Sequence, residues 1–112
     1  MLGSVGSITV AHRHSFPAGP LPERAVYIGR PSALGSPFPV GPGCSRAQSI
    51  ASYRVWARAQ FALPGPFRSE VLALAARVRT GHHLVLVCWC APLPCHGCVL
   101  ATAVRRLAAL PA

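Results

Sequence analysis

The amino-acid sequence predicts one small α/β domain over residues 1–112, with a sheet of at least three strands, at least partly parallel, and about three flanking helices in a Rossmann-like arrangement. A length of 112 residues suits one domain with its own core. The hydrophobic fraction is 52% and the charged fraction 12%, a balance typical of a folded chain. Strand-like runs are interspersed with segments of helical periodicity, in the order strand, strand, helix, helix, strand, helix.

Three segments have the pattern of β-strands. Residues 7–11 alternate in polarity, and residues 25–29 form a short apolar run of the buried type. Residues 83–89 are continuously apolar and partly β-branched, which predicts a central strand covered on both faces. Residues 30–43 contain four prolines and three glycines, so we expect a long irregular loop that wraps a functional site.

Three segments have helical periodicity. Ser45 is a suitable N-cap for a first helix, which the sequence at residues 63–66, Leu-Pro-Gly-Pro, brings to an end. Apolar positions then recur at helical spacing over residues 68–80, before Gly81. A last apolar stripe covers residues 96–110 and directly follows the strand at residues 83–89 and a short connection.

The charged residues restrict the chemistry that this chain can perform. All eleven cationic side chains are Arg, and the only acidic side chains are Glu23 and Glu70. This composition disfavours a Mg²⁺ site and a catalytic carboxylate pair. The net charge of +9 favours phosphates, nucleic acid or acidic surfaces as partners, although the Arg content could equally reflect a GC-rich coding sequence.

Nothing in the sequence predicts membrane insertion or secretion. Residues 1–10 lack the basic region of a secretory signal, and no apolar run approaches the ~20 residues of a membrane span. We therefore expect a cytoplasmic location and no membrane partner. The oligomeric state is not predicted.

The segment from Cys88 to Cys98 carries the main candidates for chemistry. It lies beyond the carboxyl end of the predicted central strand, where open α/β sheets bind ligands. Cys95 is expected at the N-terminus of the last helix, where backbone N–H groups and the helix dipole lower a thiol pKa and cradle an anion. His96 is a candidate acid or base, and Gly97 would let a ligand approach the backbone.

The cysteines of this segment have two other interpretations. Cys88 could be a small buried hydrophobic residue, the common fate of a free cysteine. Alternatively, Cys88, Cys90, Cys95 and Cys98 offer four thiols to a structural zinc ion, although a zinc ribbon usually has two separated Cys-x-x-Cys pairs. The main prediction is no cofactor, with zinc as the alternative. Cys44, alone in the loop, is taken as incidental.

Four motifs together resemble one known family. They are Val26-Tyr27-Ile28-Gly29-Arg30-Pro31, Gly35-Ser36-Pro37-Phe38, Ser45-Arg46 with Tyr53 and Trp56, and Cys88-Trp89-Cys90-Ala91-Pro92-Leu93-Pro94-Cys95-His96-Gly97. Over about residues 8–105 the chain resembles the bacterial and phage family called domain of unknown function 4326. The resemblance implies no settled activity.

The resemblance nominates a set of site residues: Arg30, Arg46, Tyr53, Trp56, Cys90, Cys95 and His96. Arg30 and Arg46 would bind phosphate or carboxylate, or else be solvated or cap a helix. Tyr53 and Trp56 are expected in the core. The chain departs from the family pattern at Ser36, where the family usually has Asn, and at Cys98, where it usually has Asp.

Two hypotheses of function remain open from the sequence. In the first, the domain binds a nucleotide or another phosphorylated ligand, held by Arg30 and Arg46, and Cys95 with His96 could make it a thiol-dependent enzyme. Ser36, Cys90 and Gly97 would also contact the ligand. In the second, the domain is a non-catalytic module, zinc-stabilised or simply basic, that binds nucleic acid.

Overall fold

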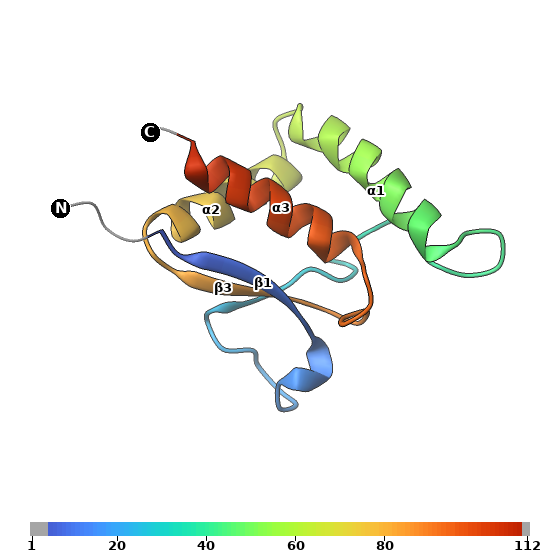
Figure 1. The fold of residues 1–112 in the computed structure, drawn as a ribbon, viewed down its shortest axis with the longest axis horizontal. Coiled ribbons are helices and arrows are strands. Elements are labelled where there is room, and N and C mark those ends of the chain that lie inside the picture. Colours follow the sequence, from blue (N-terminus) through green and yellow to red (C-terminus); the bar gives the residue numbers. More distant parts are fainter. Residues whose placement is uncertain (1–4, 111–112) are drawn as a thin grey trace.

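The structure, a computed structural model, describes residues 5–110, which form a three-stranded sheet and three α-helices (Figure 1). The α/β class, the parallel pairing and the helices are therefore as the sequence predicts. The elements are β1 (Ser7–His12), the short 3-10 helix η1 (Arg13–Ser15), β2 (Ala25–Tyr27), α1 (Arg46–Phe61), α2 (Pro66–Arg79), β3 (His83–Cys88) and α3 (His96–Ala109). None of the described helices is long and apolar enough to span a membrane.

The sheet is parallel, with β3 between β1 and β2. Ser7 to His12 of β1 pair with His83 to Cys88, and β2 pairs with Val85 to Val87. Because all the strands run in one direction, their carboxyl ends meet at one edge of the sheet. The loops that follow β2 and β3 begin at this edge, and α3 starts there as well.

The three helices lie on one side of the sheet (Figure 1), where α3 packs on β1 and β3 while α1 and α2 pack on α3 and on each other. Leu84, Leu86 and Cys88 of β3 face them and belong to the buried core. On the opposite face Val87 is buried but Val85 is only half-buried. The expectation that β3 is covered on both faces thus holds only for part of the strand, because the link from β1 to β2 contains η1 and no α-helix.

Several element boundaries differ from the predicted ones by one or two residues. α2 begins at Pro66 instead of residue 68, because the first helical position needs no N–H donor and tolerates proline. Both β2 and β3 end earlier than predicted, and α3 ends at Ala109. Ser45 is the predicted N-cap of α1 and forms a capping box with Gln48.

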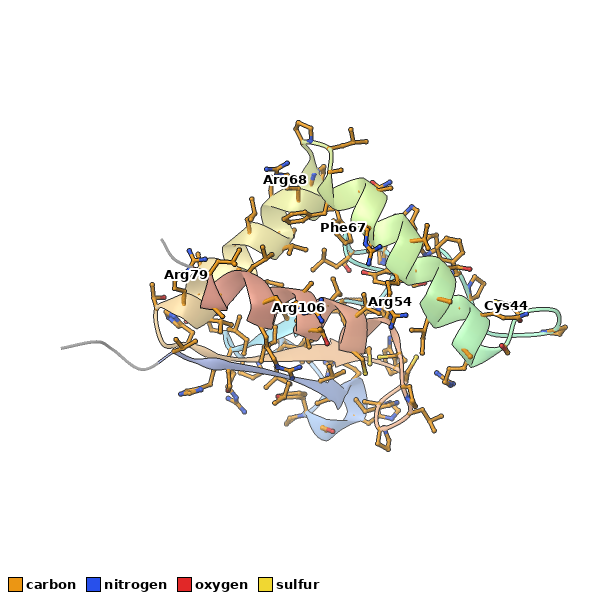
Figure 2. The ribbon with its side chains drawn as sticks, turned by 45° about the horizontal axis from the view of Figure 1, so that its top comes forward. Cys44, Arg54, Phe67, Arg68, Arg79 and Arg106 are labelled. Atoms are coloured by element: carbon orange, nitrogen blue, oxygen red, sulfur yellow. The ribbon has the colours of Figure 1, made fainter. Side chains whose placement is uncertain are left out.

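α2 packs against both neighbouring helices, and Arg79 links its C-terminal end to the C-terminal end of α3. Phe67, at the start of α2, is buried and packs edge-on against Trp56 of α1, whereas Arg68, Arg79 and Arg106 lie at the surface (Figure 2). The Arg79 guanidinium donates to the carbonyl of Leu107 at 2.6 Å. A cation at this position satisfies a free carbonyl and complements the dipole at the end of α3.

The loop at residues 30–43 is held against α1 by two hydrogen bonds to loop carbonyls. The Tyr53 hydroxyl, fully buried, donates to the carbonyl of Leu34 at 2.7 Å. The Ser49 hydroxyl, one turn earlier on α1, donates to the carbonyl of Phe38. Burial and the neighbouring Cys95 raise the pKa of Tyr53, so this hydroxyl keeps its proton as the donor. Tyr53 is therefore a core residue, as predicted.

Tyr53→Phe tests this attachment of the loop. The substitution leaves the Leu34 carbonyl without its donor inside the protein, so we expect the free energy of unfolding to fall by about 1–3 kcal/mol. Urea denaturation measures the change. Tyr27→Phe is the matched control, because the Tyr27 hydroxyl lies at the surface and its loss should cost less. Equal losses in the two variants would contradict the account.

Candidate functional site

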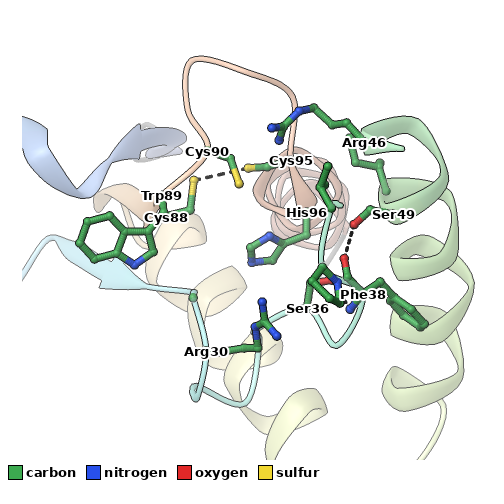
Figure 3. Close-up of a pocket in the computed structure, with 14 residues that line it drawn as sticks. Arg30, Ser36, Phe38, Arg46, Ser49, Cys88, Trp89, Cys90, Cys95 and His96 are labelled. Carbon is green, nitrogen blue, oxygen red and sulfur yellow. Dashed lines mark hydrogen bonds between the residues drawn. The ribbon is translucent and has the colours of Figure 1, made fainter. Parts of the chain in front are cut away.

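A cavity of about 290 Å³ opens at the carboxyl edge of the sheet, between the loop after β2, the first turns of α1 and the start of α3 (Figure 3). Fourteen residues line it: Gly29, Arg30, Ser36, Phe38, Pro39, Val40, Arg46, Ser49, Ile50, Cys88, Trp89, Cys90, Cys95 and His96. This cavity, the edge pocket, brings together residues that lie far apart in the sequence, from Gly29 to His96.

The edge pocket contains most of the residues that the sequence nominated. Of the seven residues that the first hypothesis of function assigns to ligand binding or catalysis, all but Gly97 line it: Arg30, Ser36, Arg46, Cys90, Cys95 and His96. Gly97 lies behind it instead. A Cβ at Gly97 would come within 3.0 Å of side-chain atoms of Val10 and Ile28, so this glycine allows α3 to pack closely on the strands.

His96 joins the start of α3 to the end of β2. Its Nε2 lies 2.8 Å from the carbonyl oxygen of Ile28. A carbonyl can only accept, so Nε2 carries the proton. The ring also packs edge-on against Tyr53, with centroids 5.0 Å apart. These contacts fix the ring, and in the neutral imidazole they leave Nδ1 as the acceptor.

Cys88 and Cys95 form a buried pair of thiols. Cys88 is the last residue of β3, Cys95 is the N-cap of α3, and their Sγ atoms are 3.4 Å apart. Both residues are at most 3% exposed. The Cys95 Sγ also accepts the backbone N–H of Gly97 at 3.3 Å. Burial of Cys88 agrees with the prediction of a small residue in the core.

The two thiols ionise differently. The pKa of Cys88 is lowered to about 5, chiefly because the Cys95 thiol donates a hydrogen bond to it and also because backbone N–H groups of Cys90 and Ala91 point at it. The pKa of Cys95 is raised, because its proton is held in the hydrogen bond to Cys88 and because it is buried. These directions favour the thiolate at Cys88, whereas the sequence favoured Cys95 as the activated thiol.

Two arginines flank the edge pocket on opposite sides of His96 (Figure 3). Arg46, the first residue of α1, donates to the carbonyl of Pro94 at 3.1 Å and so also holds the loop before α3. Arg30 is exposed, and its guanidinium points toward His96. Neither Glu23 nor Glu70 lines the pocket, so no carboxylate side chain neutralises these charges there.

A hydrogen-bonded chain holds the backbone at Arg30. The Trp89 indole N–H donates to the Tyr27 hydroxyl at 3.0 Å, and this hydroxyl donates to the carbonyl of Arg30 at 3.0 Å. A side chain at Gly29 would collide with the Tyr27 ring. Glycine is therefore required at residue 29 for the Tyr27 ring to reach the carbonyl of Arg30.

Sequence reasoning missed Ser49, which lines the pocket and holds Phe38. Its position on α1 could have identified it as a candidate residue. Ser49 lies four residues before Tyr53 and four after the N-cap Ser45, so it is a small polar residue on the buried face of the helix. A hydroxyl on such a face usually has a specific acceptor.

One comparison with known proteins gives a match. The family model described as Domain of unknown function (DUF4326) matches residues 11–106. The chain belongs to this family. No curated protein and no solved structure matches the chain. The resemblance inferred from the sequence motifs is thus confirmed, and the matched range includes every residue that lines the edge pocket.

The sequence offered four cysteines as zinc ligands. In the structure these four side chains do not surround a common point. Within residues 5–110 no three His, Cys, Asp or Glu side chains are arranged to hold a metal ion. Cys98 is exposed in the first turn of α3, whereas Cys88 and Cys95 are buried. All five cysteines are free thiols.

The substitution Cys98→Asp tests whether Cys98 simply makes the first turn of α3 less stable than an acidic residue would. Cys98 is the third residue of α3, and the first turn contains no acidic side chain. An aspartate there complements the dipole, so we expect stabilisation by about 0.5–1 kcal/mol. Thermal denaturation measures it, with Cys98→Ser as the neutral control. A clear fall in Tm for Cys98→Asp would contradict the capping argument and favour a metal at this thiol.

The ionisation of the thiol pair is tested by ultraviolet thiolate absorbance during a pH titration. In the wild-type domain, one thiolate should form as the pH rises through about 5, because the lowered pKa of Cys88 makes the thiolate its favoured form. Cys95→Ala removes the main cause and should move this step upward, toward the ordinary thiol pKa of about 8.5. Cys44→Ala, outside the pocket, is the control. An unchanged titration in Cys95→Ala would show that the pair is not coupled.

Proposed function

We propose that this domain binds a small phosphorylated ligand, such as a nucleotide, in the edge pocket. One observation carries the proposal: Arg30 and Arg46 border the same pocket as the N-terminus of α3, and no carboxylate side chain lies among them. Guanidinium groups bind phosphate oxygens through paired hydrogen bonds. The N-terminus of α3 adds a favourable dipole for the same anion, although the N–H of Gly97 already donates to the Cys95 Sγ.

The size and the lining of the pocket support a small ligand. A cavity of about 290 Å³ is near the lower limit of small-molecule sites. Its walls combine polar groups with apolar ones, including Phe38, Val40 and Ile50. Phosphate oxygens would contact the arginines, while these apolar side chains would contact a sugar, a base or another organic part of the ligand.

His96 gives the site a group that can act on a bound ligand. Because Nε2–H is held by the Ile28 carbonyl, the free Nδ1 of the neutral ring can accept a proton or a hydrogen bond. Cys90, half-buried at the pocket wall, supplies a thiol near the same place. These groups would support a thiol-dependent or acid–base reaction on the phosphorylated ligand.

Isothermal titration calorimetry with inorganic phosphate, pyrophosphate and a nucleoside monophosphate tests the proposal, at about 0.15 M salt to screen non-specific attraction. We expect saturable binding of one equivalent. Arg30→Gln and Arg46→Gln should each weaken it by about tenfold or more, because each removes a charge-assisted pair of hydrogen bonds.

Arg106→Gln is the matched control for charge. It removes the same charge from α3, ten residues and about 15 Å along the helix from the pocket. The affinity should stay within about twofold of wild type. If all three variants weaken binding equally and the affinity falls steeply with salt, the domain is a basic nucleic-acid-binding module without a specific anion site.

A further inference from the structure

The Cys88 and Cys95 thiols are arranged for chemistry with each other. Their Sγ atoms are 3.4 Å apart, so the sulfurs need to approach by only about 1.4 Å to reach the bond length of a disulfide. Cys88 ends β3 and Cys95 precedes α3, with six residues of irregular loop between them. The bond could therefore form while both elements stay in place.

Access to this pair is through the edge pocket. Cys88 and Cys95 are buried, but both contribute to the pocket lining. Both sulfurs face this cavity of about 290 Å³, which a molecule as small as hydrogen peroxide fits. The oxidant that matches this geometry is a small hydroperoxide.

We propose that Cys88 and Cys95 are a redox-active dithiol, which a small hydroperoxide oxidises to an intramolecular disulfide and a dithiol reductant restores. This reaction requires no phosphate in the same pocket. It concerns the two buried thiols, and neither arginine takes part.

The reaction balances as two successive substitutions. The Cys88 thiolate attacks the peroxide, an S–O bond forms, the O–O bond breaks, and the leaving hydroxide takes a proton to become water. Cys95 then loses its proton and attacks the sulfenic sulfur of Cys88; the S–S bond forms, the S–O bond breaks, and a second water leaves. Two thiols lose two electrons and the peroxide gains them.

The environment of each sulfur suits its step. Cys88 receives hydrogen bonds that stabilise its thiolate, which is the form that attacks a peroxide. Cys95 retains its proton beside Cys88 and therefore stays available until the sulfenic acid has formed. Because the two sulfurs are already in contact, the second step can follow before a further peroxide oxidises Cys88.

Mapping of the disulfide in the full wild-type chain tests the proposal. The reduced protein is treated with one equivalent of hydrogen peroxide, unfolded in N-ethylmaleimide, and digested with trypsin and chymotrypsin. Cleavage after Trp89 separates Cys88 from Cys90 and the later cysteines. We expect the Cys88 peptide to be linked to the peptide that contains Cys95, and dithiothreitol to release it, with Cys44, Cys90 and Cys98 carrying maleimide.

Two single variants identify the partner of Cys88. In Cys90→Ser the link should remain. In Cys95→Ser it should be lost, and dimedone should label the sulfenic acid that persists at Cys88. Circular dichroism establishes that both variants are folded, and the wild-type map stands without them. The proposal is overturned if wild-type Cys88 and Cys95 both carry maleimide after oxidation, or if the link needs Cys90 and not Cys95.

Discussion

The arrangement of this domain depends on how the first turn of α3 is held against the end of the sheet. The His96 side chain donates to the carbonyl of Ile28, and Gly97 lets the helix approach the strands closely. Cys95, just before them, contacts Cys88 at the end of β3. Three segments are thereby fixed to one another, and the edge pocket is the space that they leave with the start of α1.

The second constraint is electrostatic. The pocket has two guanidinium groups and no carboxylate side chain, so the Cys88 thiolate would be its main anionic group. Formation of a Cys88–Cys95 disulfide would remove that charge. The proposed anion site and the proposed dithiol would then be coupled, since the oxidised pocket would attract a phosphate more strongly than the reduced one.

The sequence predicted the fold class and most of the pocket because both depend on local patterns. A run of apolar residues gave β3, the N-cap gave α1, and the family motifs brought Arg30 and Arg46 to one site. The ionisation of the thiols could not be predicted, because it depends on a contact between Cys88 and Cys95 that only the tertiary packing creates. The incomplete cover on one face of β3 was not predicted either, because it too depends on tertiary packing.

The most direct test of the anion site is nuclear magnetic resonance of the ¹⁵N-labelled domain during titration with inorganic phosphate. We expect saturable shifts of the backbone amide of His96, at the start of α3, and of the Nε–H signals of Arg30 and Arg46, with the other arginines unmoved. Shifts spread over all the arginine signals, with no response at the start of α3, would contradict this expectation.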